Sequence, residues 1–262
     1  MLDHNVILTT RWLLIAAVGA VGCDHGAPPW RSLFNGKNLD GWYSWRDGIG
    51  KNTDDVGMFT VKNGEIHLLD TELTPNQFQF AYLATTGEYE NYRVRFEYKW
   101  GPRMYVSFGP DSGFFVHAVG PDMIWPRSVE CQVNLGDTGS MYLFDYATLD
   151  TTIDPAVPAP TYLESGIPYA APRNPNPNYA RVTHSAAYDT LTDWNAVEVI
   201  AMGGDLEFIV NGNTTFRGTS LKQPDPAFPA DPSKDIPLTR GRIVLQQEGS
   251  EVWYRNIEIQ DL

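Results

Sequence analysis

The chain has 262 residues, of which 13% are aromatic and 19% charged, and its formal net charge is −13. This composition is typical of a globular protein with a large core and excludes a disordered chain. The acidic balance excludes nucleic acid as a partner, because no basic stripe is present to neutralise phosphates, and it argues against adhesion to anionic lipid headgroups. It is compatible with neutral sugars or bound cations.

The N-terminal segment has the features of an export signal. Arg11 precedes a short apolar run over 12–22, which is too short to span a bilayer but fits a secretory hydrophobic region. The segment "AVGC" is similar to a bacterial lipobox, in which Cys23 would be lipidated and become the mature N-terminus. We therefore predict a lipoprotein-type signal peptide over 1–22, a linker over 23–30, and an exported protein held on the periplasmic side of the membrane through Cys23. Secretion without an anchor is the alternative.

Strand signals dominate after residue 30, and helical periodicity is nearly absent. The segment 58–69 predicts a hairpin that turns at Asn63-Gly64, a dipeptide that tolerates positive φ. Further strands are expected over 92–100, 113–119, 128–135, 194–213 (with turns at Gly203-Gly204 and Asn211-Gly212), 241–249 and 251–259. Many short strands with turn signals indicate an all-β, two-sheet sandwich over 31–262, one sheet of which presents a broad concave surface.

Two proline-rich stretches interrupt the strand pattern, at about 150–193 and at 222–237. Proline cannot donate to a sheet ladder, so we expect both stretches to be loops. Long loops in a compact domain are usually functional lids or decorations. Neither stretch marks a domain boundary, because strands of the same character resume on both sides.

The segment "SVECQVNL" (128–135) is amphipathic in an unusual way. Its apolar face consists of Val129, Cys131, Val133 and Leu135, and its polar face of Ser128, Glu130, Gln132 and Asn134. A strand that merely faces water usually carries several charges, whereas Glu130 is the single charge on this polar face, beside amides and a hydroxyl. Such side chains suit the binding of hydroxyl groups. The structural alternative is that Glu130 pairs with a basic residue of 92–100 across the sheet.

Several motifs, taken in order, resemble one known family. The segment "SLFNGKNLDGWYSW" (32–45) is similar to the opening motif of the 3-keto-disaccharide hydrolase domain family, long catalogued as a domain of unknown function. The segments "YRVRFEYKW", "DSGFFVHAV", "SVECQVNLGDTGSMY", "DWNAVEVIAMGGDLEFIVNG" and "GRIVLQQEGSEVWYRNIEI" resemble its later strands. The resemblance covers the chain from about residue 31 to the end, with the proline-rich stretches as insertions, and it implies a concanavalin-A-like jelly-roll sandwich.

The same resemblance implies an activity, the cleavage of glycosides already oxidised at C3 of the sugar. A carbonyl at C3 acidifies the C2–H bond, so a base near C2 and donors or a cation near O3 would suffice. The paired carboxylates of ordinary glycosidases are not required. The chain departs from the family in having Asp111 where Asn is frequent and Glu248 where many members have His. The sequence leaves open whether a divalent metal ion takes part.

Catalytic candidates are Glu130 and His117, the latter as a base or a metal ligand. Candidate substrate-binding residues are Gln132, Glu97, Lys99, Gln246 and Glu248. Each has a structural alternative: a satisfied histidine for His117, a cross-strand ion pair for Glu97 and Lys99, and a polar strand surface or end for the others. Trp45, Trp125 and Tyr142 could stack on sugar rings, although aromatic residues of a sandwich are usually core.

The expected partner is therefore a carbohydrate, an oxidised glycoside. A second hypothesis is a non-catalytic carbohydrate-binding lipoprotein with the same sandwich. A third is a structural surface lipoprotein that binds a protein partner. No Ser-His-Asp motif, phosphate-binding loop or cysteine-based zinc spacing is apparent in the sequence.

Overall fold

The computed structural model describes residues 28–74, 78–107 and 109–262. The predicted signal peptide over 1–22 and the predicted lipidation residue Cys23 lie outside these ranges. Within the described ranges the chain forms two antiparallel β-sheets and one short 3-10 helix, η1 (Pro232–Lys234). None of the described residues belongs to a helix with the length and apolarity needed to cross a membrane.

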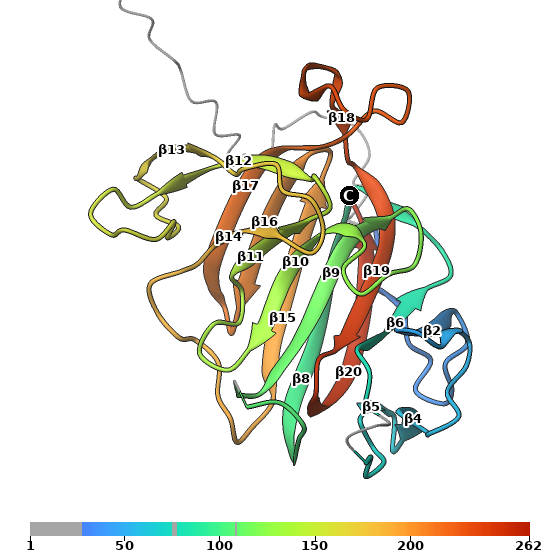
Figure 1. The fold of residues 1–262 in the computed structure, drawn as a ribbon. Coiled ribbons are helices and arrows are strands. Elements are labelled where there is room, and N and C mark those ends of the chain that lie inside the picture. The colour runs from blue at the N-terminus through green and yellow to red at the C-terminus, as the bar shows by residue number, and fades with distance from the viewer. Residues whose placement is uncertain (1–27, 75–77, 108) are drawn as a thin grey trace, which may run out of the picture.

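Figure 1 shows the two sheets packed as layers. Among the described residues, the first sheet has eleven strands in the order β13 (Ile167–Ala170), β12 (Thr148–Ile153), β17 (Asn213–Gln223), β16 (Asp205–Val210), β15 (Asn195–Met202), β8 (Tyr92–Met104), β20 (Ser250–Asp261), β5 (Glu65–Leu68) and β4 (Phe59–Lys62), with β1 (Arg31–Ser32) on β20 and β18 (Ile236–Pro237) on β17. The second sheet of the described chain has nine strands in the order β14 (Tyr179–Val182), β11 (Met141–Phe144), β10 (Arg127–Asn134), β9 (Asp111–Val119), β19 (Arg240–Gln247), β6 (Ala81–Thr85), β2 (Trp42–Arg46) and β3 (Gly50–Lys51), with β7 (Tyr89–Glu90) on β19. The predicted two-sheet jelly-roll sandwich is thus confirmed.

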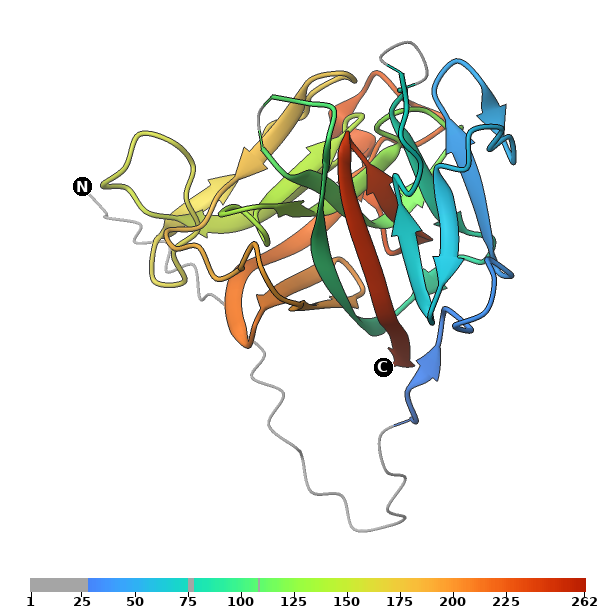
Figure 2. The same cartoon turned by 90° about the horizontal axis from the view of Figure 1, so that it is seen from below.

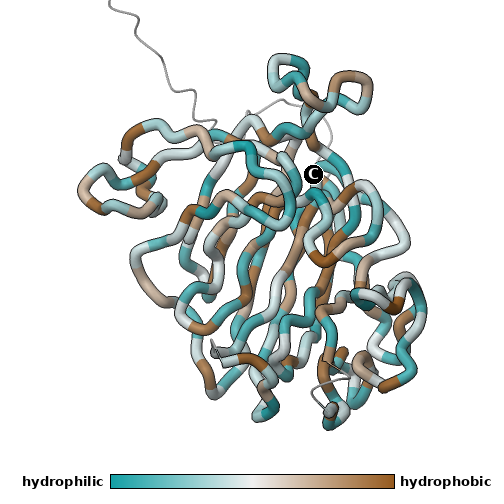
Figure 3. Tube along the Cα trace, viewed as in Figure 1, coloured by the Kyte–Doolittle hydropathy of each residue, from teal (hydrophilic) through white to brown (hydrophobic). Residues whose placement is uncertain are grey.

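Strand alternation produces the core between the sheets. On β8 the residues Tyr92, Val94, Phe96, Tyr98 and Trp100 are buried, whereas the intervening charged residues point outward. Figure 3 shows hydrophobic and hydrophilic residues following one another along the central strands. Because one face of each sheet removes its apolar side chains from water, the sandwich is stabilised chiefly by this shared core.

The predicted turns are also found. Asn63-Gly64 joins β4 to β5, and both residues have positive φ, as the shortest hairpin turns require. Gly203-Gly204 joins β15 to β16, and Asn211-Gly212 joins β16 to β17.

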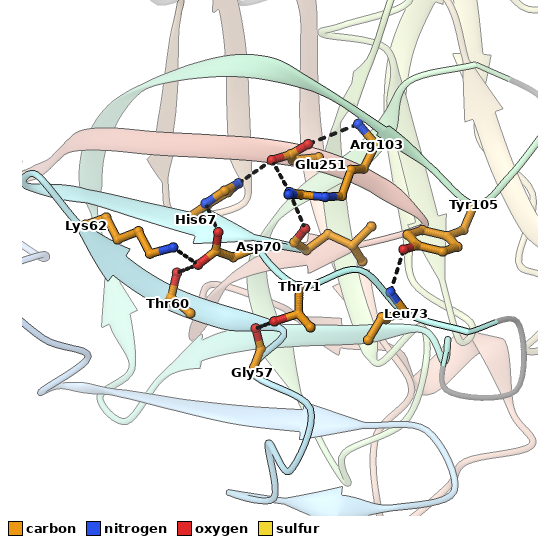
Figure 4. A network of polar contacts seen from close by, with 11 residues as sticks. Gly57, Thr60, Lys62, His67, Asp70, Thr71, Leu73, Arg103, Tyr105 and Glu251 are labelled. Carbon is orange, nitrogen blue, oxygen red and sulfur yellow. Dashed lines mark hydrogen bonds and ion pairs between the residues drawn. The ribbon is translucent and has the colours of Figure 1, made fainter.

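The β4–β5 hairpin is fastened to β20 by a buried polar network (Figure 4). His67 on β5 lies between two carboxyl groups, with Nδ1 2.9 Å from Oδ1 of Asp70 and Nε2 2.8 Å from Oε1 of Glu251. Arg103 also donates to Glu251, through Nη1 at 2.6 Å and the backbone N–H at 3.0 Å. Figure 2 shows the hairpin lying alongside β20. The network therefore holds together segments that are far apart in the sequence.

The two proline-rich stretches are only partly loops, which corrects the prediction. The first contributes the end of β12 and the strands β13 and β14, and the second contains the end of β17, η1 and β18. Prolines are tolerated there because β13 is an edge strand, where Pro168 pairs with Thr152 on one side and leaves the other side open. In Figure 1 the β12–β13 connection and the β18 region project from the sandwich.

A second apolar cluster lies on the outer face of the second sheet. It consists of Tyr43, Trp45, Tyr82, Ala84, Phe115, Ala118, Phe144 and Val244, with Ile124, Trp125 and Tyr142 packed against it. Because strand residues alternate between faces, this cluster shares the face on which Glu130 lies, away from the inter-sheet core. A sheet face that simply meets solvent seldom carries both a buried apolar cluster and a buried acid.

Candidate functional site

The centre of the candidate site lies above Gly113, where two neighbouring side chains occupy the space that a side chain at this position would fill. Gly113 on β9 lies between Gln132 on β10 and Gln246 on β19 in the strand register. A Cβ at residue 113 would overlap Oε1 of Glu130 and would lie 2.6 Å from Oε1 of Gln246. The missing side chain therefore lets an acid from one neighbouring strand and an amide from the other meet above β9.

Both of these oxygens are buried acceptors without a hydrogen-bond partner among the described residues. Glu130 is 2% exposed and Gln246 is 1% exposed. Burying an acceptor without a donor costs free energy of the order of 1–3 kcal/mol. Two such oxygens in one place indicate either that the acid carries a proton or that a ligand's hydroxyl groups supply the missing donors.

Two more carboxyl groups surround this centre. Glu248, just after β19, accepts a hydrogen bond from Nε2 of Gln246 at 2.9 Å and another from Nε1 of Trp125 at 3.2 Å. Asp111, at the start of β9, is paired in register with Asn134 on β10, and its Oδ1 is buried without a partner. The site thus holds three acids on three neighbouring segments of one sheet face.

Burial and neighbouring carboxyl groups raise the pKa of all three acids. Burial and then the negative charges of Glu248 and Asp111 raise the pKa of Glu130 well above its usual value. Burial, followed by the charge of Asp111, raises the pKa of Glu248 to about 8. Burial also raises the pKa of Asp111 to about 7, although hydrogen bonds involving Asn134 and Ser112 oppose the shift. Near neutral pH the cluster therefore holds both protonated and ionised carboxyl groups, as acid–base chemistry requires.

Gln132 belongs to the same face. It is 6% exposed, and its Oε1 accepts the backbone N–H of Val133 at 2.8 Å. Tyr142 lies opposite Glu130 on β11 and shares the outer face. The amide nitrogen of Gln132 and the phenol of Tyr142 are suited to contact a ligand that binds at Glu130.

The loop over 120–126 covers one side of the cluster. Its Asp122 accepts hydrogen bonds through Oδ1 from the hydroxyls of both Tyr43 and Tyr82, each at 2.6 Å. Tyr82 in turn stacks on Trp45, with ring centroids 5.1 Å apart. These contacts anchor the loop to β2 and β6, so that Trp125 reaches Glu248.

The first proline-rich insertion supports the same loop. Asn176 donates through Nδ2 to the backbone oxygen of Trp125 at 2.7 Å. Tyr179 on β14 packs against Tyr142, with ring centroids 5.0 Å apart, and against Phe144 at 6.1 Å. The insertion therefore forms one wall of the candidate site.

His117 does not join Glu130, which corrects its assignment as a catalytic candidate. A bulge in β9 opposite Arg127 and Val129 and a φ of 53° at His117 turn its side chain into the inter-sheet core. There it contacts the ring of Tyr92, with centroids 5.7 Å apart, and is fully buried. Burial lowers its pKa to about 4. His117 is thus a neutral core residue, but it is not the satisfied histidine of the structural alternative, because neither ring nitrogen has a hydrogen-bond partner among the described residues.

Glu97 and Lys99 also lie away from the cluster. They are on β8, on the outer face of the first sheet, so the whole sandwich separates them from Glu130. Oε2 of Glu97 accepts from Nε of Arg255 at 2.6 Å, and Lys99 lies over the rings of Trp194 and Trp253. The cross-strand ion pair is therefore the correct interpretation of Glu97, and neither residue binds substrate at this site.

Of the predicted residues, the structure brings together Glu130, Gln132, Gln246 and Glu248. The sequence analysis did not identify Asp111 and Gly113 as parts of this site. It also did not decide whether Trp125 stacks on a sugar ring or belongs to the core. The pattern 111, 113, 115 alternates with the core residues of β9, so alternation could have placed Asp111 on the outer face. The register that sets it beside Asn134 required the structure.

The described residues form no group of three or more His, Cys, Asp or Glu side chains arranged to hold a metal ion. The steps proposed below are assigned to the protein's own side chains.

Comparison with known proteins finds similar folds and one matching family model. Two Parabacteroides distasonis structures named as candidate glycosyl hydrolases match the fold, one with a TM-score of 0.51 and 22% identity, covering 89% of this chain and 94% of that one. The other has a TM-score of 0.50 and 19% identity, covering 89% of this chain and 100% of that one. No curated protein matches. The model of the 3-keto-alpha-glucoside-1,2-lyase-like domain matches residues 29–260. The chain therefore belongs to the 3-keto-alpha-glucoside-1,2-lyase-like domain family and is a carbohydrate-active protein.

Proposed function

We propose that this protein cleaves glycosides that carry a carbonyl at C3, and that the cluster around Glu130 performs the reaction. The observation that supports this most directly is the meeting of two unpartnered acceptor oxygens, from Glu130 and Gln246, above Gly113. A sugar presents hydroxyl donors that would satisfy both oxygens. The family match supports the same class of substrate.

The chemistry needs one base and one acid. The C3 carbonyl acidifies the C2–H bond, so a carboxylate removes that proton and leaves an enolate. The electron pair then forms the C1–C2 double bond while the C1–O bond breaks, and the departing oxygen takes a proton from a neighbouring acid. Water adds to C1 of the enone and a proton returns to C2, so the net result is hydrolysis of the glycosidic bond.

We assign proton removal at C2 to Glu130 and protonation of the departing oxygen to Glu248. A carboxyl group whose pKa is raised is a stronger base once it is ionised, and donors from bound substrate favour the ionised form. Glu248, with its pKa at about 8, retains its proton near neutral pH. The amides of Gln132 and Gln246 bind sugar hydroxyls, and Trp125 contributes an apolar surface beside them.

The decisive test is the release of free 3-keto-sugar from a 3-keto-disaccharide, with the corresponding unoxidised disaccharide as the substrate control. We expect product from the oxidised substrate alone. Glu130→Gln should lower the rate about 10²–10⁴-fold, as loss of a general base does. The matched control Glu207→Gln changes an acid on the first sheet, where Glu207 pairs with Arg217, and should leave the rate unchanged.

Three outcomes are distinguishable. Folded protein that yields no product, whether treated with a chelator or supplied with divalent metals, would refute the proposed activity. Retention of glycans by both the original protein and Glu130→Gln, without product, would favour a carbohydrate-binding module. Loss of activity on chelation alone would show that a metal takes part.

We further propose that the protein is exported and anchored through a lipid at Cys23. The support is the "AVGC" segment after a short apolar run. Metabolic labelling with a radioactive fatty acid should mark the protein, and Cys23→Ala should abolish the label. Unlabelled protein found free in the periplasm would refute the lipid anchor and indicate ordinary secretion instead.

A further inference from the structure

A groove of about 390 Å³ lies on the outer face of the first sheet, across the sandwich from Glu130. Its lining comes from β8, β15, β16, β20 and the turn after β16. Its lining includes Arg95, Glu97, Ala196, Glu198, Asn256 and Glu258. The chemistry at Glu130 uses none of these residues, so the groove needs a separate explanation.

Two tryptophans contact Arg95, which lines the groove, and Arg255, which donates to the lining residue Glu97. Trp30 lies over Arg95, whose Cζ is 4.1 Å from the ring centroid. Trp194 lies over Arg255 at 3.8 Å and beside Lys99 at 5.0 Å. Arg95 and Lys99 are four residues apart on one strand, a rise of about 13 Å. Both indoles are only partly buried, so each retains apolar surface near the groove.

The floor of the groove carries polar groups that are already oriented. Arg95 donates through Nε to Oε2 of Glu258 at 2.8 Å, and Asn256 donates through Nδ2 to Oε2 of Glu97 at 3.0 Å. A register shift in β20 between Arg255 and Glu258, with a φ of 51° at Asn256, places that amide at the groove. Planar groups held in this way offer further donors and acceptors without first losing rotamer freedom.

We propose that this groove is a second, non-catalytic binding site for a neutral oligosaccharide chain. Partly exposed indoles near a polar floor suit sugars, which present C–H faces and hydroxyl edges. The charges favour a neutral ligand, because each carboxylate of the groove is already paired with an arginine: Glu97 with Arg255, Glu198 with Arg93 and Glu258 with Arg95. Such a site would hold the enzyme on a glycan while the opposite face acts on a smaller sugar.

The site can be tested by affinity electrophoresis of the full chain through gels that contain dextran, laminarin or hydroxyethylcellulose, with alginate as a polyanionic comparison. We expect at least one neutral glucan to retard the protein. Trp194→Ala and Trp30→Ala should each weaken the retardation about 10-fold or more. Ala196→Gln, which fills the groove from an exposed position, should do the same without touching the core.

The controls separate this site from the catalytic cluster. Glu130→Gln should be retarded like the original protein, and the groove variants should cleave a small 3-keto-disaccharide at the original rate. Retardation that disappears in Glu130→Gln but survives Trp194→Ala and Ala196→Gln would overturn the proposal. So would the absence of retardation in all three neutral glucans, or retardation by alginate alone.

Discussion

Glu130 and Gly113 share one space: the carboxyl group of the acid occupies the position that a side chain at residue 113 would fill. The acid on β10 can therefore lie across β9 only because its neighbour has no Cβ. This relationship makes the glycine a positioning element of the proposed reaction, although it carries no functional group.

Gly113→Ala should consequently inactivate the enzyme. The added methyl group would displace the carboxyl group of Glu130 and the amide of Gln246, and misplacement of a reacting group by about 1 Å can cost about 10²-fold in rate. Overpacking should also lower the free energy of unfolding by about 1–3 kcal/mol. The measurement is kcat/KM on a 3-keto-disaccharide, together with urea unfolding. Gly87→Ala is the matched control, since the nearest atom to its added Cβ is a tyrosine hydroxyl at 3.4 Å. Unchanged kcat/KM in Gly113→Ala would contradict the proposed position of Glu130.

Stability should fall as pH rises. The pKa of Glu248 is raised from 4.5 to about 8, so the folded state binds more protons than the unfolded state between these values. The stabilisation that Glu248 contributes is therefore fully present below about pH 4.5 and is lost as pH rises through about 8. Glu248→Gln should flatten this dependence, measured by urea unfolding at pH 5, 7 and 9. An equally steep decline in the variant would assign the effect to other groups.

Trp125 should influence the pKa of Glu248, the acid that it contacts. Trp125→Phe removes the N–H that Glu248 accepts, and that hydrogen bond lowers the pKa of Glu248. The basic limb of the pH–rate profile should therefore move to higher pH in the variant, with a moderate fall in kcat. The phenyl ring can preserve packing beside Phe144, on which the indole stacks with centroids 6.0 Å apart. A fall in kcat with an unmoved basic limb would mean that the indole serves only as a wall of the site.

The network at His67 should contribute to stability and not to catalytic activity (Figure 4). Glu251→Ala would remove the carboxylate that His67 and Arg103 share and leave His67 with Asp70 alone. Breaking a buried ion pair from one side costs about 3–5 kcal/mol. The matched control is Glu88→Ala, which removes an exposed ion pair with Arg240 and should cost less than about 1 kcal/mol. Thermal unfolding gives both values. The folded fraction of Glu251→Ala should retain the original kcat, and a lower kcat would show that the two sheets are coupled.

Local patterns were sufficient to predict much of the fold. The turn at Asn63-Gly64 and the alternation of 92–100 follow from backbone sterics and strand geometry within a few residues. The same alternation placed Glu130 and Gln132 on the outer face correctly. Alternation identifies the face of a strand, however, and does not identify which sheet the strand joins. Glu97 alternates as cleanly as Glu130 but belongs to the other layer.

The remaining errors arose where the regular pattern is interrupted or where distant strands meet. The bulge at His117 reverses the side on which that residue lies, and nothing in "GFFVHAV" marks it. Asp111 joins the cluster only through the pairing of β9 with β10, a register between segments that the sequence alone does not align. The proline-rich segment 150–193 was predicted as loop because proline lacks a donor, yet an edge strand tolerates that loss.

The same insertion has a consequence for solubility. Its strands β13 and β14 form the outermost strands at the same end of the two sheets, and a bridge between Thr161 and Thr183 connects the two strand segments there. Open sheet edges are where β-proteins recruit further chains into fibrils. Pro168 in β13 has no amide hydrogen to offer such a chain, and the loop that carries Thr161 lies against the end of β14. Removal of this insertion should therefore expose β11 and β17 to pairing with other molecules and make the protein prone to aggregation.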